Sequence, residues 1–259
     1  MLNSIEIKKL ILKIAYEANK GHIGSALSIS DLLVSVFNQL ISENGLSKDK
    51  NSVTLSKGHA ALALYSCLFK LNLISEKELN SYEKDNSLFG THPDPLIPWV
   101  NFLGGSLGQG FTFAAGLALA HQIDNKETRH YVILSDSELN SGVIWEVAAI
   151  SGTRKLNNLV VILDNNKQQA LNLTKNVLIY EDVESSFHSL GWKVLKADGH
   201  DIKDLQKKIS EKSDKPLLVI ADTRFGAGIS FMDGNIDWHY LPLTDELYEK
   251  AVKELEDQK

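Results

Sequence analysis

The stretch that decides the fold spans residues 129–166 and reads RHYVILSDSELNSGVIWEVAAISGTRKLNNLVVILDNN. It contains two short apolar runs, Tyr131 to Leu134 and Leu159 to Leu163, which are rich in Val and Ile and bounded by polar residues. Such runs are typical of strands that are buried on both faces of a parallel sheet. Between them, residues 138–154 carry apolar side chains at helical spacing. We therefore predict a strand, a helix and a second strand.

Polar side chains follow each of the two predicted strands. Asp136 comes after the first strand and Asn166 after the second, thirty positions later. Because the carboxyl ends of parallel strands lie at one edge of a sheet, we expect these two side chains to meet. Their oxygen atoms suit Mg²⁺ or Ca²⁺, and Mg²⁺ usually adds water and phosphate oxygens. A helix that starts at Glu138 would aim its N–H groups at that phosphate, although polar strand ends are also common in solvated loops.

This segment resembles the metal and diphosphate motif of thiamine diphosphate enzymes in its transketolase form, where Gly-Asp-Gly opens the motif and an Asn closes it. The resemblance implies that Asp136 and Asn166 bind Mg²⁺ through their side chains and that Gln168 adds a backbone carbonyl. Ca²⁺ or Mn²⁺ would be able to substitute. The two glycines of the family motif are Ser135 and Ser137 here, and a Cβ atom can obstruct close approach to a phosphate. Ser137 is expected to contact the coenzyme through its N–H or its hydroxyl.

Length and composition limit the possible functions. The chain has 259 residues, 43% of them hydrophobic, which suits one domain spanning residues 1–259. Its net charge of -6 and scattered basic residues predict no nucleic-acid partner. The amino terminus lacks a signal-peptide pattern, and no apolar run approaches the roughly 20 residues of a membrane span, so we expect no membrane contact. A single cysteine, Cys67, excludes an internal disulfide and predicts a cytoplasmic location.

The rest of the chain alternates between predicted helices and strands. Helices are expected at residues 4–19, after a cap at Ser28 or Ser30, after residue 59, and at 75–85, 107–121, 182–190, 202–211 and from 244 onward. Further strands are expected at residues 52–55, 192–197 and 216–221. This alternation predicts an α/β fold with a parallel central sheet, right-handed crossovers and helices on both faces.

Four other motifs each hold one histidine: Gly-His-Ile-Gly at 21–24, Ser-Lys-Gly-His-Ala at 56–60, Thr-His-Pro-Asp at 91–94 and Asp-Trp-His at 237–239. They resemble transketolase motifs in the same order. The resemblance implies that His22 and His92 face the substrate and that His59 lies by the coenzyme diphosphate and the donor substrate. His239 would be a fourth active-site histidine. Each histidine, considered alone, is also compatible with a capping, packing or loop role.

A glycine-rich motif, Gly-Ser-Leu-Gly-Gln-Gly, occupies residues 105–110. Alone it is compatible with a turn that allows close helix packing. It also resembles the transketolase sequence Thr-Gly-Ser-Leu-Gly-Gln-Gly, which implies that Gly105, Ser106 and Leu107 line the coenzyme. Asp-Gly-His-Asp at 198–201 resembles the family as well, but we interpret His200 as a structural turn and cap residue.

The resemblance covers about residues 4–255 and implies the thiamine diphosphate-binding fold. It implies transfer of a two-carbon ketol unit from a ketose or ketose phosphate to an aldose, with the coenzyme attacking the ketose carbonyl. The histidines would place and protonate the sugar. The family's pyrimidine-binding domain, which carries a catalytic Glu, has no counterpart in this sequence. We therefore expect a C-terminal partner subunit that completes the active site, two copies of each subunit, and no activity without the partner.

Two other interpretations remain open. A non-catalytic or regulatory subunit is one, because Ser135, Ser137 and Ser141 replace two glycines and a glutamate of the family pattern. A related enzyme on the same scaffold is the other, such as a deoxyxylulose-phosphate synthase or a biosynthetic transketolase for an unusual sugar. The presence of all four histidines favours sugar chemistry over decarboxylation of simple 2-oxo acids.

Overall fold

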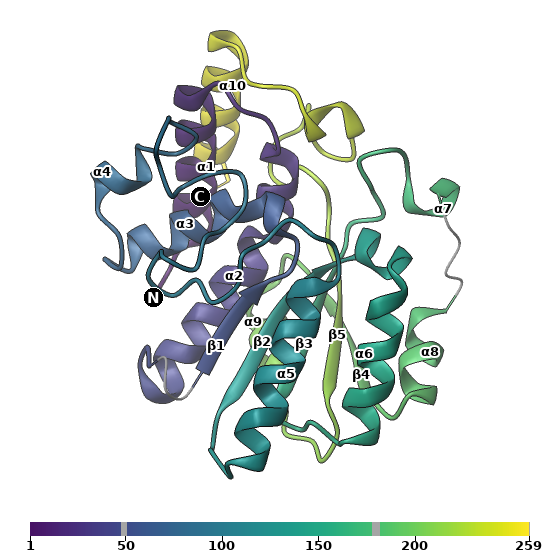
Figure 1. Cartoon of the computed structure of the whole chain (residues 1–259). Helices are drawn as coiled ribbons and strands as arrows, with labels where there is room; N and C mark the ends of the chain where they lie inside the picture. Colours follow the sequence, from purple (N-terminus) through teal and green to yellow (C-terminus); the bar gives the residue numbers. More distant parts are fainter. Residues whose placement is uncertain (48–50, 178–181, 259) are drawn as a thin grey trace.

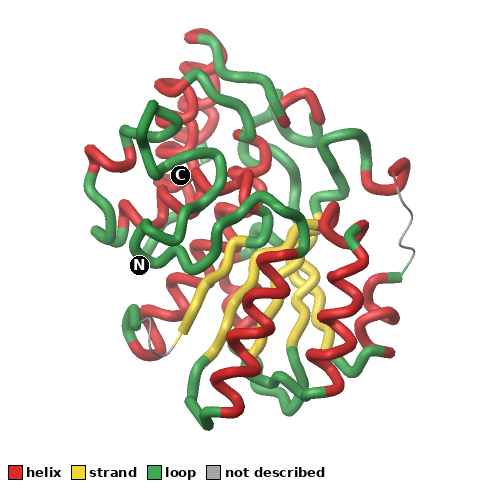
Figure 2. The backbone as a smooth tube through the Cα atoms, in the orientation of Figure 1, coloured by secondary structure: helices red, strands yellow, loops and turns green. Residues whose placement is uncertain are grey.

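Five parallel strands form one sheet in a computed structural model that describes residues 1–47, 51–177 and 182–258 (Figures 1 and 2). The strand order is β1-β2-β3-β5-β4. The strands are β1 (Asn51–Leu55), β2 (Arg129–Ser135), β3 (Leu159–Asn165), β4 (Lys193–Asp198) and β5 (Leu217–Asp222). The predicted parallel α/β fold is therefore confirmed.

The pairing of β2 with β3 sets the position of the polar segments that follow them. The two strands run parallel, and Ser135 lies opposite Asp164 in the register. The next residues of both strands therefore leave the sheet at the same edge. Since β3 lies between β2 and β5, the loop after β3 is central at this edge. In Figure 1 the loops at this edge gather above the sheet.

Helices cover both faces of the sheet, as predicted, and alternate residues of β2 point to the two layers. Tyr131 and Ile133 pack in one apolar cluster, and Val132 and Leu134 in another. The first cluster contains side chains of α1 (Ser4–Ala18), α2 (Ile23–Asn44), α3 (Ala61–Lys70), α9 (Ile202–Ile209) and α10 (Asp245–Glu256). The second contains side chains of α5 (Gln109–Ile123), α6 (Gly142–Thr153) and α8 (Val183–Ser189). Figure 1 shows α5 and α6 in front of the sheet and α2 behind it.

The shorter elements are α4 (Glu76–Leu79), α7 (Thr174–Val177) and three 3₁₀ turns, η1 (Gly58–Ala60), η2 (Asp136–Asn140) and η3 (Ile236–His239). The predicted helix at 75–85 is thus wrong in length. Ser75 and Glu78 form a capping box that starts it, but Glu83 has a φ of 57° and cannot belong to a right-handed helix.

The helix predicted from Glu138 begins later, at Gly142. Ser135 and Glu138 form a capping box that winds a tight 3₁₀ turn, and Ser141 then has extended backbone angles. The prediction that a helix starts at Glu138 and directs its N–H groups at a phosphate is therefore wrong. The predicted cap of α2 at Ser28 or Ser30 is also wrong, because α2 begins at Ile23.

Helix α2 also corrects the expectation that no stretch resembles a membrane span. Within the described part of the chain it is the one helix with the length and mean hydropathy of a span, over Ile23–Glu43. However, 94% of this window is buried inside the protein. A central core helix has the same composition, because it is covered on most sides.

Glycine at position 152 is required by the packing of α6. A Cβ at this position would lie 1.7 Å from the carbonyl oxygen of Leu190, whereas a Cβ on Gly116 of α5 would meet nothing within 4 Å. We expect Gly152→Ala to lower the free energy of unfolding by about 1 to 3 kcal/mol. The control Gly116→Ala should raise it by roughly 0.5 to 1 kcal/mol, since glycine weakens helices. Urea unfolding of both variants checks this, and equal effects would contradict the packing argument.

Candidate active site

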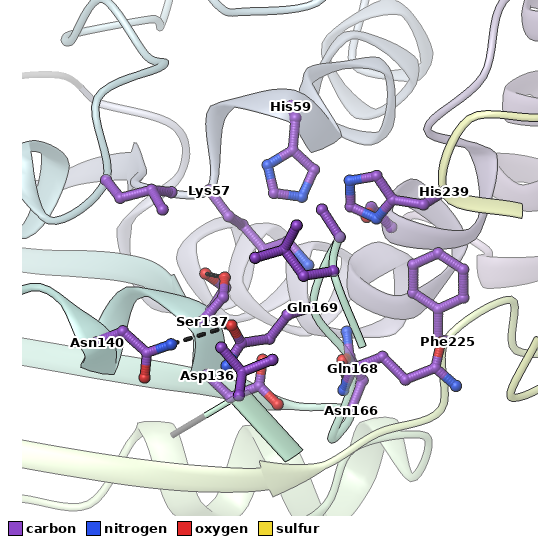
Figure 3. Close-up of a pocket in the computed structure, with 16 residues that line it drawn as sticks. Lys57, His59, Asp136, Ser137, Asn140, Asn166, Gln168, Gln169, Phe225 and His239 are labelled. Atoms are coloured by element: carbon purple, nitrogen blue, oxygen red, sulfur yellow. Dashed lines mark hydrogen bonds between the residues drawn. The ribbon is translucent and has the colours of Figure 1, made fainter. Parts of the chain in front are cut away.

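A cavity of about 290 Å³ lies at the carboxyl edge of the sheet (Figure 3). The residues that line it include seven of the predicted site residues: His59, Leu107, Asp136, Ser137, Asn166, Gln168 and His239. Figure 3 shows the two histidines at one end and Asp136 with Asn166 at the other, with Lys57 between them. His22, His92, Gly105 and Ser106 lie outside this lining and are described below.

The carboxylate of Asp136 is almost completely buried, at 2% exposure. One oxygen, Oδ2, accepts hydrogen bonds from the Lys167 N–H at 2.8 Å and the Thr174 hydroxyl at 3.0 Å. The other, Oδ1, is buried and has no hydrogen-bond partner among the described residues. Burial, and then the charge of Asp164, raise the pKa of Asp136 to about 7. Because a buried acceptor without a partner is costly, this oxygen is suited to a cation.

The side chain of Asn166 is held in one orientation. Its Nδ2 donates to Asp164 Oδ2 at 3.0 Å and to Ser28 Oγ at 3.2 Å, and its Oδ1 accepts from the Gln168 N–H at 2.9 Å. The amide oxygen therefore points away from Asp164. Asn166 and Asp136 line the same cavity, so their predicted proximity is confirmed. Their role as metal ligands stays a prediction.

Oxygen acceptors without partners gather around this end of the cavity. Besides Asp136 Oδ1, the Asn140 and Gln168 side-chain oxygens are buried and unpartnered within the described ranges. No group of three or more His, Cys, Asp or Glu side chains that could hold a metal occurs in those ranges. A cation here would therefore depend on one carboxylate with amide and carbonyl oxygens. That donor set fits Mg²⁺, which keeps waters and takes phosphate oxygens.

Lys57 and Asp164 form a buried ion pair that the sequence patterns had not indicated. Their side chains are 1% and 0% exposed. Asp164 also accepts hydrogen bonds from Ser28 at 2.7 Å, from Thr223 and from Asn166. Lys57 lines the cavity, so it brings a positive charge to a place where an anion would bind. The position of Asp164 directly after the apolar run Leu159 to Leu163 was the available signal in the sequence.

Glu138 is a second buried acid that we had not assigned to the site. It is fully buried, and its Oε1 accepts from the Ser56 hydroxyl and the Gly108 N–H. Its Oε2 accepts from the N–H and the hydroxyl of Ser135. Burial raises its pKa, and the four hydrogen bonds oppose this. Glu138 thus joins the loop after β1, the end of β2 and the start of α5. The Ser-x-x-Glu spacing of a capping box was the signal in the sequence.

The two serines at the motif glycines fit without backbone strain. Ser135 has φ −95° and ψ 154°, which any L residue adopts. Ser137 is absent from the residues with positive φ in the described chain. Ser137 lines the cavity, and its hydroxyl lies 2.9 Å from that of Ser135. Glycine is therefore not needed at either position for the backbone to follow this path.

Three of the predicted histidines gather at the other end of the cavity. The ring centroids of His22, His59 and His239 lie 5.2 to 5.7 Å apart. The His22 N–H donates to the His239 carbonyl at 3.0 Å, which joins the start of α2 to the turn η3. His22 has a φ of 61°, a left-handed conformation that ends the loop before α2. The structure therefore assembles residues from both ends of the chain.

His92 and the glycine-rich loop pack beside this cluster. A Cβ on Gly58 would lie 3.0 Å from the His92 ring and 2.9 Å from the backbone of Gly105. Gly105 has a φ of 126°, which only glycine adopts easily, and its own Cβ would lie 3.5 Å from His92. Leu107 lines the cavity and Ser106 is exposed. Their contact with a coenzyme stays a prediction.

The histidine cluster is held in its neutral form. Burial, followed by the charge of His92, lowers the pKa of His22; burial and then Lys57 lower the pKa of His59 well below its usual value. Burial and His22 lower the pKa of His239 to about 4. The Phe225 ring stacks on His239 with centroids 6.0 Å apart. Neutral imidazoles can both donate and accept hydrogen bonds at neutral pH.

His200 lies away from this cluster. Its Nδ1 lies 2.7 Å from Asp31 Oδ2, and its Nε2 accepts from the Arg224 N–H at 2.9 Å. The Asp31 carboxylate also binds Lys8. These contacts join α1 and α2 to the loops after β4 and β5, consistent with the structural role we predicted.

Comparison with known proteins places this site in a family. Residues 3–256 match the family model described as the transketolase, thiamine diphosphate binding domain. The chain belongs to the transketolase family. The resemblance that we had inferred from the motifs is therefore confirmed.

Two relatives of similar length are named as transketolase subunits. One subunit of the apulose-4-phosphate transketolase of Phocaeicola vulgatus is 31% identical, with 99% of this chain and 94% of that protein covered. One subunit of the 6-deoxy-6-sulfo-D-fructose transketolase of a Clostridium species is 32% identical, with 96% and 94% covered. These names support the interpretation as one subunit of a split transketolase.

Transketolases with a longer chain share the fold. The crystal structure of Campylobacter jejuni transketolase superposes with a TM-score of 0.90 at 26% identity, covering 99% of this chain. This chain spans only 43% of that transketolase chain. It corresponds to the thiamine diphosphate-binding part of the family.

The lowered pKa of His239 predicts a pH-dependent stability. The folded protein binds this proton only near pH 4, whereas the unfolded chain binds it near pH 6.5. The stabilisation is therefore full above pH 6.5 and is lost as the pH falls toward 4. As the pH falls from 6.5 toward 4, the free energy of unfolding of the wild type should therefore decrease relative to that of His239→Gln. Urea unfolding between pH 7 and 4 measures it, and a difference independent of pH would contradict the assignment.

Glu138→Gln should weaken the connection between the loop after β1, the end of β2 and the start of α5. The amide replaces one acceptor oxygen by a donor, so at least one of the N–H groups of Ser135 and Gly108 loses its partner. We expect the free energy of unfolding to fall by about 2 to 4 kcal/mol. Glu146→Gln, on the exposed face of α6, should change it by less than about 0.5 kcal/mol. Chemical denaturation of both variants checks this, and similar values would show that the buried carboxylate is not needed.

Proposed function

We propose that the chain is the amino-terminal subunit of a thiamine diphosphate- and Mg²⁺-dependent transketolase. It would transfer a two-carbon ketol unit from a ketose or ketose phosphate to an aldose. One observation carries this proposal: a single cavity has unpartnered acceptor oxygens at one end and a neutral histidine cluster at the other. A cation with a phosphate fits the first end, and a sugar fits the second.

The residues at the acid end would hold the cofactors. Asp136 and Asn166 would bind Mg²⁺, with the Gln168 backbone carbonyl as a third ligand, and Ca²⁺ or Mn²⁺ would be able to substitute. The ammonium group of Lys57 would offset the charge of the diphosphate. Gly105, Ser106, Leu107 and Ser137 would line the coenzyme. Thiamine diphosphate, when bound, supplies the group that adds to the ketose carbonyl and stabilises the carbanion left after carbon–carbon cleavage.

The histidines would handle the sugar. His22, His59, His92 and His239 come from four different segments of the chain, so together they can contact several positions of one ketose. Where neutral, an imidazole can donate a hydrogen bond to the ketose carbonyl oxygen through its N–H, or accept a proton from a hydroxyl on its other nitrogen. Fixing the donor in this way also lowers the entropy cost of reaching the reactive geometry.

An apolar surface supports the presence of a partner. Helices α5 and α6 have few polar residues on any side, although only one side of each packs on the sheet. Phe113 of α5, Ile150 of α6, and Leu103 and Leu107 before α5 are 38 to 60% exposed. Helices of this composition are normally covered on all sides. We propose that the C-terminal transketolase subunit covers them and completes the cavity, with two copies of each subunit.

Two further parts of the proposal rest on the chain and its relatives. The relatives named for apulose-4-phosphate and for 6-deoxy-6-sulfo-D-fructose support a ketose donor outside the common sugar phosphates. The one cysteine, Cys67, is buried and unpaired, which supports a reducing, cytoplasmic location.

An assay of the assembled and the separate subunits tests the function. With Mg²⁺, thiamine diphosphate, a ketose donor and an aldose acceptor, we expect ketol transfer by the complex and at least about 100-fold less by this chain alone. Asp136→Asn should remove most activity and metal binding in the complex, because it loses the charged ligand. Asp85→Asn, a substitution at an exposed position, is the control.

Other outcomes identify the alternatives. Full activity of the chain alone would contradict the partner requirement. Calorimetry that detects no binding of thiamine diphosphate and Mg²⁺ to the complex would support the non-catalytic subunit. Consumption of a 2-oxo acid with release of CO₂ would instead support an enzyme of the deoxyxylulose-phosphate synthase type.

A further inference from the structure

A short chain of hydroxyl groups runs from the cavity to the buried Glu138. Ser137 Oγ lies 2.9 Å from Ser135 Oγ, and Ser135 Oγ lies 3.1 Å from Glu138 Oε2. Each hydroxyl has one hydrogen to donate and can accept through its lone pairs. The direction of donation along this chain therefore decides what Ser137 presents to the cavity.

The contacts of Glu138 fix that direction. Its two oxygens receive the N–H groups of Gly108 and Ser135, which can only donate. The Ser56 hydroxyl accepts from the Phe111 N–H, so its hydrogen is free to point at Glu138. When Glu138 is ionised its carboxylate accepts from all four groups, and the Ser135 hydroxyl donates to Oε2.

The same reasoning extends to Ser137. Because Ser135 uses its one hydrogen toward Glu138, it can only accept from the Ser137 hydroxyl. The hydrogen of Ser137 is then directed away from the cavity, and a lone pair of Ser137 Oγ remains for whatever occupies the cavity. Asp136, Asn140 and Gln168 line the same cavity, and each has a buried side-chain oxygen without a partner, whereas Gln169 has an unpartnered amide nitrogen. The unpartnered acceptors therefore outnumber the one unpartnered donor among these lining residues.

We propose that the hydroxyl oxygen of Ser137 binds the divalent cation, directly or through a water on the cation, rather than donating to the diphosphate. An acceptor matches a cation or a metal-bound water, whereas a phosphate oxygen needs a donor. The serine at this glycine position would then add to the metal end of the site. This inference rests on the proposed function and assigns a role to a residue for which the sequence had indicated only contact with the coenzyme.

The test measures cation and coenzyme affinity separately in the assembled complex with its partner subunit. Mn²⁺ binding is followed by electron paramagnetic resonance at a fixed, saturating concentration of thiamine diphosphate, and coenzyme binding by calorimetry at saturating Mn²⁺. For Ser137→Ala we expect Mn²⁺ affinity to fall about 10-fold. Coenzyme affinity at saturating Mn²⁺ should stay within about twofold, because no hydrogen bond to the phosphate is lost.

Two further variants make the test independent of folding defects. Ser137→Gly removes the same oxygen without an apolar methyl group and should give the same loss. Ser135→Ala keeps Ser137 but removes the acceptor of its hydrogen, so that hydrogen can turn toward the cavity and Mn²⁺ affinity should again fall. Ser141→Ala, which changes a neighbouring serine outside the cavity lining, is the control.

The outcomes separate this inference from the proposed function. If wild type binds Mn²⁺ and both Ser137 variants bind it equally well, the inference is wrong and the proposed function stands. A loss of coenzyme affinity at saturating Mn²⁺ would instead show that Ser137 donates to the phosphate, which also overturns it. If the wild-type complex binds neither Mn²⁺ nor thiamine diphosphate, the proposed function itself fails.

Discussion

The buried ion pair between Lys57 and Asp164 is the interaction on which the rest of the site depends. Asp164 has no exposed surface, and Lys57, Ser28, Thr223 and Asn166 all direct a hydrogen bond at its carboxylate. These partners come from the loop after β1, from α2, from the loop after β5 and from the loop after β3. Removing one member of such a pair leaves an uncompensated buried charge, which typically costs about 3 to 5 kcal/mol. One carboxylate therefore fixes four segments, and it orients the Asn166 amide.

The two ends of the cavity lie on either side of this ion pair and differ in their electrostatics. At one end, Asp136 and Asp164 are both buried, and their repulsion contributes to the raised pKa of Asp136. A cation would relieve that repulsion and satisfy the free oxygen of Asp136. At the other end, burial first, and then Lys57 and the mutual repulsion of the histidines, lower the pKa values of His59 and His239 and favour their neutral forms. The same ammonium group thus favours an anion in the cavity and uncharged imidazoles beside it. Burial of the Asp136 carboxylate and of the histidines is unfavourable, and such groups are typical of binding sites that a ligand stabilises.

The exposed faces of α5 and α6 fit this picture of an incomplete site. Leu107 both lines the cavity and remains 44% exposed, so a protein that covers the apolar surface would also cover the cavity. Burial of these side chains would exclude water and strengthen each electrostatic contact inside. The glycine-rich loop is already held on its inner side by Glu138 through Gly108. Its outer side carries the exposed side chain of Leu107.

Apolar periodicity and strand-end residues were sufficient to predict the parallel sheet, its two helix layers and the meeting of Asp136 with Asn166, because these follow from local patterns and from the direction of parallel strands. The motifs were sufficient for the family. The position of α6 was mispredicted, since a capping box at Ser135 diverted the backbone into a 3₁₀ turn. The resemblance implied that these histidines share one site, but only the tertiary structure showed that the rings of His22, His59 and His239 pack together and that Lys57 pairs with Asp164. Contacts between residues far apart in the sequence depend on how layers pack, and no local pattern in the sequence records that geometry.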